Sequence, residues 1–153
     1  MVIHTLPLEL FEEPLICTDP SLTSFSKLKA RFVVLYFYPK DHTPGCSLQA
    51  QNFRDYYDEF KNLNACILGI SRESLNSHLK FKEKNQLPFE RISDAQERWC
   101  KSFGVLKEKK MFGKTSYGIE RSTFIFDNQA KLLKAYRKVK VPHHVETVLE
   151  DLK

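Results

Sequence analysis

One continuous apolar run constrains the fold more than any other feature of this sequence. Residues 32–38 read FVVLYFY, with no alternation between apolar and polar side chains, and Pro39 follows directly. A strand of this composition is typically buried on both faces, as a central strand is when helices cover both sides of its sheet. Proline has no N–H for the strand ladder, so the strand is expected to end at this point.

The rest of the chain carries helix, strand and loop signals in a consistent order. They are a helix over 46–62, a strand over 65–70, a helix over 74–84 capped by Ser71 or Ser74, a short helix over 95–103, a Lys- and Gly-rich loop over 104–118, a hairpin of strands 122–126 and 132–136, and a last helix with Val145, Val148, Leu149 and Leu152 on one face. Residues 1–31 are irregular, with short strands expected at 14–18 and 22–25.

This order has a parallel half and an antiparallel half, so the sequence predicts an α/β fold with a central mixed β-sheet flanked by helices. The chain has 153 residues, and no linker or repeat divides it. A single domain spanning residues 1–153 is therefore expected.

Charge and hydropathy exclude several classes of function. The net charge is +5, from 24 basic and 19 acidic residues that are interleaved along the chain, and the most basic run, 107–110, contains Glu108. Nucleic-acid binders concentrate positive charge on one element, so no nucleic-acid partner is expected. No apolar stretch reaches 18 residues, and the first 20 residues lack the basic start and apolar core of a secretory signal. The sequence predicts a cytoplasmic protein with no membrane partner.

The four cysteines are Cys17, Cys46, Cys66 and Cys100, and none forms a CxxC pair. Neither a zinc knuckle nor a local dithiol is therefore expected, and no metal site. Cys46 differs from the other three in its position. It follows the loop 40–45 (KDHTPG), at the carboxyl end of the buried strand and the start of a helix, where reactive sites of open α/β sheets are commonly found.

A thiolate at the start of a helix is stabilised by the free N–H groups and the helix dipole, by about 0.3–2 kcal/mol. About 3.4 kcal/mol is needed to turn an ordinary thiol into one that is mostly ionised at neutral pH. A cation from elsewhere in the fold is therefore expected beside Cys46. Thr43 can place a hydroxyl against the reacting atom, Pro44 can shield the site, and Gly45 allows close backbone approach. The alternative is a Pro-Gly turn in which the cysteine is incidental.

Residues 33–46 (VVLYFYPKDHTPGC) closely resemble the peroxidatic segment of peroxiredoxins of the bacterioferritin-comigratory-protein (PrxQ) subfamily. Pro39, Thr43 and Cys46 match the Pro-x-x-x-Thr-x-x-Cys motif of that family, and residues 118–124 (GIERSTF) match a later segment. The resemblance covers roughly residues 30–152, whereas the first 30 residues match poorly. It implies a thioredoxin-like fold and a thiol peroxidase.

The resemblance also implies roles for individual residues. The Cys46 thiolate would attack hydrogen peroxide or an organic hydroperoxide, forming a sulfenic acid. Thr43 would hydrogen-bond the peroxide, Pro39 belongs to the same motif, and Arg121 corresponds to the arginine of the family and would supply the missing cation. No metal or organic cofactor is implied. The reductant would be thioredoxin or another thiol, and the protein a monomer or weak homodimer.

The step that reduces the sulfenic acid stays open. The positions at which the family carries a resolving cysteine hold Gln51 and, approximately, Lys82. Either an external thiol attacks directly, or an unusual resolver acts within the chain. Cys66 is expected to be a core residue, and Cys17 cannot be placed. Cys100, on a short helix, is the possible resolving residue expected to be the most accessible.

Two other functions compete with the peroxidase. One is a thioredoxin-fold redox sensor or chaperone-like protein without turnover, which would not consume peroxide repeatedly. The other is a basic nucleic-acid-binding module, which would bind DNA in a salt-sensitive way. The pair His143–His144, at the start of the last helix, is expected to be solvated rather than to bind a metal.

Overall fold

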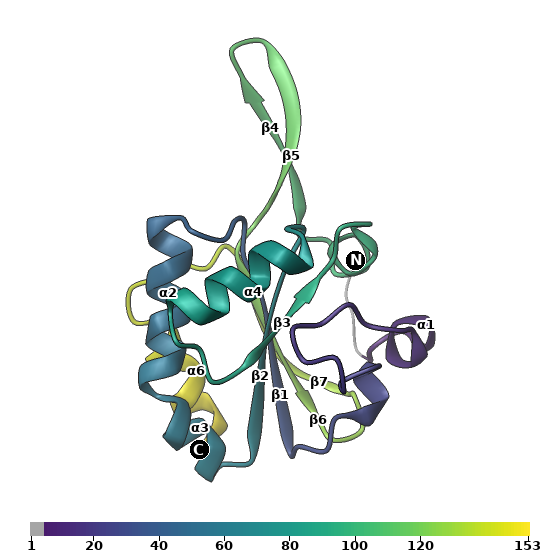
Figure 1. The fold of residues 1–153 in the computed structure, drawn as a ribbon, viewed down its shortest axis with the longest axis vertical. Helices are drawn as coiled ribbons and strands as arrows, with labels where there is room; N and C mark the ends of the chain where they lie inside the picture. The colour runs from purple at the N-terminus through teal and green to yellow at the C-terminus, as the bar shows by residue number, and fades with distance from the viewer. Residues whose placement is uncertain (1–4) are drawn as a thin grey trace.

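The computed structural model describes residues 5–153 and contains a five-stranded mixed sheet in the order β3-β2-β1-β6-β7 (Figure 1). The central strand β1 (Phe32–Phe37) is parallel to β2 (Ala65–Ser71) and antiparallel to β6 (Ser122–Asp127). The outer strands are β3 (Glu90–Ser93), parallel to β2, and β7 (Leu132–Tyr136), antiparallel to β6. The predicted α/β architecture is confirmed, and β3 is a strand that sequence reasoning missed.

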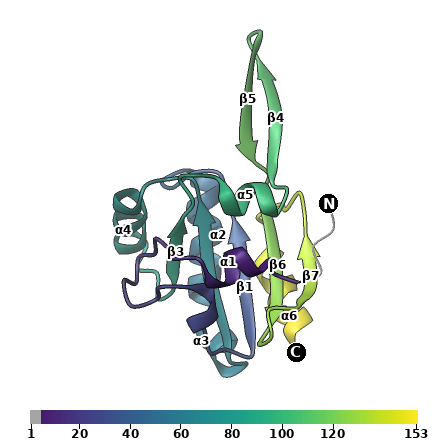
Figure 2. The ribbon, with the colours of Figure 1, turned by 90° about the vertical axis from the view of Figure 1, so that its right-hand side faces the viewer.

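Side chains alternate along β1 between two separate hydrophobic cores, one on each face of the sheet. Val33, Leu35 and Phe37 enter one core, and Val34 and Tyr36 enter the other. The α2 face is covered by α2 (Pro44–Asp55), α3 (Tyr57–Asn62), α4 (Leu75–Lys84) and α6 (His144–Leu152). The α5 face is covered by α1 (Leu8–Glu12), the short 3₁₀ helix η1 (Phe25–Lys27) and α5 (Arg98–Ser102). Figure 2 is viewed from the α5 face, with α1 and α5 in front of the sheet.

The predicted helix 46–62 is two helices. Tyr56 leaves helical geometry at φ −101° and ψ 9°, which separates α2 from α3. The break keeps Phe60 in the core of the α2 face, where its ring centroid lies 5.8 Å from that of Phe53. Packing of the aromatic rings therefore overrides the continuous helical pattern.

The predicted loop 104–118 is wrong, because these residues form a β-hairpin of β4 (Leu106–Met111) and β5 (Lys114–Ile119). Its turn places Phe112 and Gly113 at positive φ, 53° and 74°, as tight hairpin turns require. The hairpin projects away from the body (Figure 1) and is exposed on both faces over most of its length. With no buried face, its sequence has no apolar alternation to predict a strand.

The short strands predicted at 14–18 and 22–25 are also wrong. In place of strands, this region has an isolated bridge between Cys17 and Ile92 and scattered backbone hydrogen bonds, among them one from Leu15 N–H to Thr23 O at 2.8 Å. The short helix α1 was not predicted, since its five residues bury only Leu10 and are too few to show a period. The first four residues of this region lie outside the described part of the chain. No helix within residues 5–153 has the length and apolar character needed to cross a membrane.

Candidate active site

Cys46 is the third residue of α2, the helix that follows the loop after β1. Thr43 is the N-cap in extended geometry, Pro44 is the first helical residue, and the Ser47 N–H donates to the Thr43 carbonyl at 2.9 Å. Proline suits that first position because its missing N–H would have no intrahelical partner. The Cys46 side chain is only 2% exposed and belongs to the core of the α2 face. A thiol is thus held at a helix N-terminus with little competing water.

Arg121 supplies a cation next to this thiol from the short connection between β5 and β6. Its Nη2 lies 3.5 Å from Cys46 Sγ, and its Nη1 donates to Gln49 Oε1 at 2.6 Å. Gln49 is fully buried, so it holds the guanidinium in place from within α2. Gly45 lies directly beside this arrangement, since an added Cβ would be in van der Waals contact with Arg121 Nη2 at 3.4 Å.

The Thr43 hydroxyl donates its proton to the Lys40 carbonyl at 2.8 Å. Its oxygen is then left with acceptor lone pairs, and it can accept a hydrogen bond from the O–H of a peroxide. Pro39 is half-buried at the start of the same loop, directly after the fully buried Tyr38. The loop therefore presents an acceptor near a thiol that has a guanidinium donor beside it.

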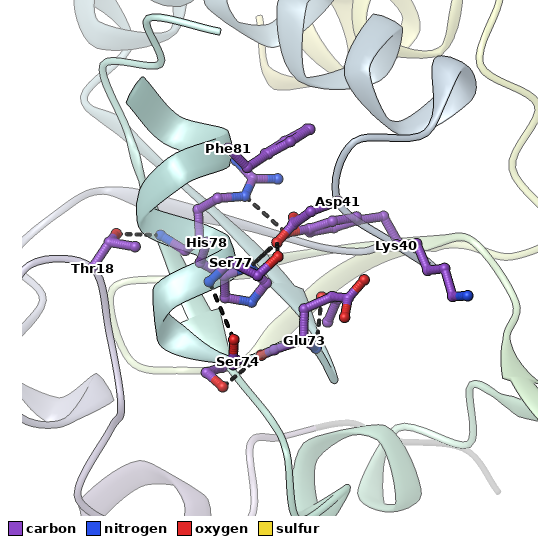
Figure 3. A network of polar contacts seen from close by, with 12 residues as sticks. Thr18, Lys40, Asp41, Glu73, Ser74, Ser77, His78 and Phe81 are labelled. Atoms are coloured by element: carbon purple, nitrogen blue, oxygen red, sulfur yellow. Dashed lines mark hydrogen bonds and ion pairs between the residues drawn. The ribbon is translucent and has the colours of Figure 1, made fainter. Parts of the chain in front are cut away.

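A buried carboxylate holds this loop against α4, as Figure 3 shows. Asp41 accepts hydrogen bonds from Tyr38 Oη (2.6 Å), Ser77 Oγ (2.8 Å) and His78 Nδ1 (2.6 Å). Burial raises the pKa of Asp41, but the hydrogen bond and charge of His78 and the hydrogen bonds of Tyr38 and Ser77 together outweigh it and leave the pKa below its ordinary value. His78 Nε2 also donates to the Ile92 carbonyl at 3.1 Å, so both ring nitrogens have hydrogen-bond partners and the ring is fixed in place.

The same network continues to Arg91, which is fully buried. Its Nε donates to Tyr38 Oη at 2.9 Å and its Nη2 donates to Tyr36 Oη, while the guanidinium lies 4.6 Å from the centroid of the Tyr38 ring. Gly69 allows this packing, because an added Cβ would lie 2.6 Å from Arg91 Nη2. The network links β1, β3, α4 and the loop that carries Thr43.

Sequence reasoning missed Asp41, His78 and Arg91 as parts of this site. The one available signal was Arg91 itself, a charged residue within the otherwise largely apolar segment 87–92. A buried charge requires partners, but the sequence does not show that Tyr36 of β1 and Tyr38, just after this strand, provide them.

His144 was expected to be solvated, and this is wrong. It is 7% exposed, its Nε2 lies 2.8 Å from Thr123 Oγ1, and its ring contacts Tyr136 edge-on with centroids 5.3 Å apart. Burial, followed by the charge of Arg121, lowers the pKa of His144 to about 4. The neighbouring His143 is exposed, as predicted. A neutral imidazole is therefore buried within the electrostatic reach of Arg121.

This burial makes stability depend on pH. The His144 pKa is 6.5 in an unfolded chain and about 4 in the folded one. The contribution of the neutral His144 ring to the free energy of unfolding is therefore complete above pH 6.5, and it is lost as the pH falls from 6.5 to 4. The difference corresponds to about 3 kcal/mol. Urea unfolding at pH 7 and at pH 4 measures this effect. Between the two pH values, the free energy of unfolding of His144→Gln should fall by about 3 kcal/mol less than that of the wild type. Equal losses in the two proteins would contradict the assignment.

Cys100 was expected to be the most accessible of the remaining cysteines, and this is wrong. Its side chain is fully buried, because α5 turns both Trp99 and Cys100 into the core of the α5 face. Cys66 is half-buried, not a fully enclosed core residue, and Cys17 is buried. All four cysteines are free thiols. Within residues 5–153, no cluster of three His, Cys, Asp or Glu side chains could hold a metal ion.

The sheet order and the thiol at the start of α2 define a class of protein that comparison identifies. The model of the AhpC/TSA family matches residues 8–135, and the chain belongs to this family. Peroxiredoxin Bcp of Bacillus subtilis is 49% identical over 128 residues, covering 84% of this chain and 82% of the relative. Peroxiredoxin Bcp of Xanthomonas campestris is 42% identical over 148 residues, covering 97% and 92%.

Solved structures of related proteins support the same family assignment. The bacterioferritin comigratory protein of Xanthomonas campestris, studied for its alkyl peroxide reduction activity, superimposes with a TM-score of 0.91 at 39% identity, covering 99% of this chain and 97% of that one. Peroxiredoxin Q of the same organism gives 0.91 at 41% identity, covering 98% and 95%. The predicted resemblance to the Bcp/PrxQ peroxiredoxins is confirmed, and so is the thioredoxin-like fold. The activity is that of a thiol peroxidase.

Proposed function

We propose that Cys46 is the nucleophile of this thiol peroxidase and that its substrates are hydrogen peroxide and organic hydroperoxides. The observation that carries the proposal is the placement of the Arg121 guanidinium, 3.5 Å from Sγ and fixed by Gln49. The thiolate attacks the terminal peroxide oxygen, an S–O bond forms and the O–O bond breaks. Cys46 becomes a sulfenic acid, and the departing hydroxide or alkoxide takes a proton to leave as water or an alcohol.

The neighbouring residues have distinct roles in this step. Thr43 accepts a hydrogen bond from the peroxide O–H and so orients the terminal oxygen toward sulfur. Arg121 stabilises the thiolate and the negative charge that develops on the departing oxygen. Pro39 fixes the entry of the loop, and the Asp41 network holds the loop against α4.

The sulfenic acid is returned to the thiol by thioredoxin or another thiol, with no metal or organic cofactor. The proposed setting is the cytoplasm, where isolated free cysteines such as these persist. A monomer or weak homodimer suffices, since Thr43, Cys46 and Arg121 all come from one chain. No nucleic acid takes part in this cycle.

Peroxide consumption in the presence of excess dithiothreitol tests the function directly. Hydrogen peroxide and tert-butyl hydroperoxide should each be consumed over many turnovers, in proportion to enzyme concentration. Consumption that stops after one equivalent would instead indicate a redox sensor without turnover.

A further inference from the structure

Cys46 and the other three cysteines lie on opposite faces of the central sheet. Cys46 belongs to the core of the α2 face, whereas Cys17 and Cys100 belong to the core of the α5 face and Cys66 packs against that same core. The alternation along β2 agrees with this, because Cys66 pairs in register with Val33, which also enters the α5-face core. The backbone of a five-stranded sheet therefore separates the reacting sulfur from every other thiol of the chain.

A disulfide needs Cα atoms within about 7 Å of one another and side chains directed toward each other. Side chains on opposite faces of a sheet point apart, so the second condition is not met through the sheet. Cys66 is further fixed within strand β2, and Cys17 is tied to β3 by its bridge to Ile92. Bringing either sulfur to Cys46 would require the central sheet to come apart.

Cys100 could reach Cys46 only around the carboxyl end of the sheet, and its surroundings oppose this. Its backbone N–H donates to Asp94 Oδ2 at 2.8 Å, and it neighbours Trp99, which is 4% exposed in the same core. Burial, followed by the negative charge of Asp94, raises the pKa of the Cys100 thiol well above its ordinary value. Burial likewise raises the pKa of Cys66, to about 11. Attack on a sulfenic acid requires a thiolate, so both are poor resolvers at neutral pH.

The positions where relatives would carry a resolver already have other partners. Gln51 Nε2 donates to Asn85 Oδ1 at 2.9 Å, and Lys82 Nζ pairs with Glu90 Oε1 at 2.6 Å. Around Cys46 itself, Pro44 is exposed and Leu48 is 47% exposed. The side of α2 open to solvent next to the reacting sulfur is therefore the side from which a separate molecule can approach.

We propose that the enzyme runs a one-cysteine cycle, in which the Cys46 sulfenic acid is reduced by a thiol of another molecule, arriving at the exposed start of α2. This rests on the proposed function of Cys46. The incoming thiolate attacks the Cys46 sulfur, an S–S bond forms, the S–O bond breaks, and the hydroxyl leaves with a proton as water. A second thiol then attacks the donor sulfur of this mixed disulfide, which releases the Cys46 thiolate and carries the two electrons away as a donor disulfide.

The test is mass spectrometry of the wild-type protein after one equivalent of hydrogen peroxide with no thiol present, followed by dimedone or by glutathione. We expect a single added oxygen at Cys46, a dimedone adduct at that residue, and a Cys46–glutathione disulfide when glutathione is given. A disulfide between Cys46 and Cys17, Cys66 or Cys100, or between two copies of the chain, would overturn the proposal while leaving Cys46 as the nucleophile. No oxidation of Cys46 would overturn the proposed function as well.

Variants give a second, independent measurement. After one equivalent of hydrogen peroxide with no thiol present, Cys66→Ala and Cys100→Ala should each give a yield of the Cys46 dimedone adduct within about twofold of the wild type, if they fold, since a residue that never bonds to Cys46 does not compete for its sulfenic acid. A tenfold or greater rise in that yield in a variant with an unchanged unfolding transition would identify the replaced cysteine as a resolver and overturn the one-cysteine cycle. Because the peptide map uses the wild-type protein, poor folding of Cys100→Ala leaves it unaffected.

Discussion

Replacing Cys46 with serine is expected to lower the rate of peroxide consumption by at least about 10⁴-fold, a loss of the size seen when the nucleophile of a covalent mechanism is removed. The physical reason is that a serine hydroxyl remains protonated at neutral pH even beside Arg121. It therefore cannot attack the peroxide oxygen. The measurement is steady-state consumption of hydrogen peroxide with dithiothreitol as the reductant.

Cys66→Ser is the matched control, because it makes the same atomic change in a half-buried thiol on the other face of the sheet. It should retain the wild-type rate within about twofold. Activity in Cys46→Ser above the background of dithiothreitol alone would contradict the assignment of the nucleophile. Thermal unfolding of both variants shows whether the fold is retained.

Arg121→Ala is expected to lower the second-order rate constant for peroxide reduction by about 10²–10³-fold, the usual effect of removing one donor that stabilises developing charge. Two contributions are lost together, because the guanidinium contacts both Sγ and Gln49. The rate constant of Arg121→Lys should lie between those of the wild type and Arg121→Ala, since lysine keeps a charge but not the paired donor geometry.

Arg72→Ala is the control for loss of a surface arginine near the hairpin. Arg72 donates to Glu97 Oε2 at 2.9 Å and to the Tyr117 carbonyl at 3.0 Å, and neither of these groups belongs to the Cys46 site. The second-order rate constant of Arg72→Ala should stay within about threefold of the wild-type value. If Arg121→Ala also stayed within threefold, Arg121 would have no role in the chemistry.

The parts of the fold predicted correctly from sequence are those whose burial leaves a pattern in the sequence. Residues 32–38 lack polar alternation because β1 is covered on both faces, and the last helix shows its buried stripe directly. The hairpin β4–β5 buries neither face over most of its length, so its strands carry no such pattern. The strand β3 has only four residues, too few to show a period.

Some features of the candidate site could likewise be predicted from the sequence, and others could not. The position of Cys46 followed from local order, a buried strand, a Pro-Gly loop and then a helix. The need for a cation followed from the energy of ionising a thiol. That Gln49 would fix Arg121 depends on a contact between residues 72 positions apart, which spacing cannot reveal. The separation of Cys46 from the other cysteines depends on the face of the sheet against which each helix or loop packs. The sequence does not show that face, so it could not decide which thiol reduces the sulfenic acid.

The central claim is that the fold activates Cys46 toward peroxide, and the rate of a single turnover tests it most directly. The wild-type protein, reduced and freed of thiols, would be mixed with hydrogen peroxide at pH 7, quenched at millisecond intervals and scored by mass for oxygen added at Cys46. A sulfur with a guanidinium donor 3.5 Å away, able to stabilise the charge on the departing oxygen, should react at least about 10³-fold faster than free cysteine. A rate constant equal to that of free cysteine would contradict the account, whatever the fold resembles.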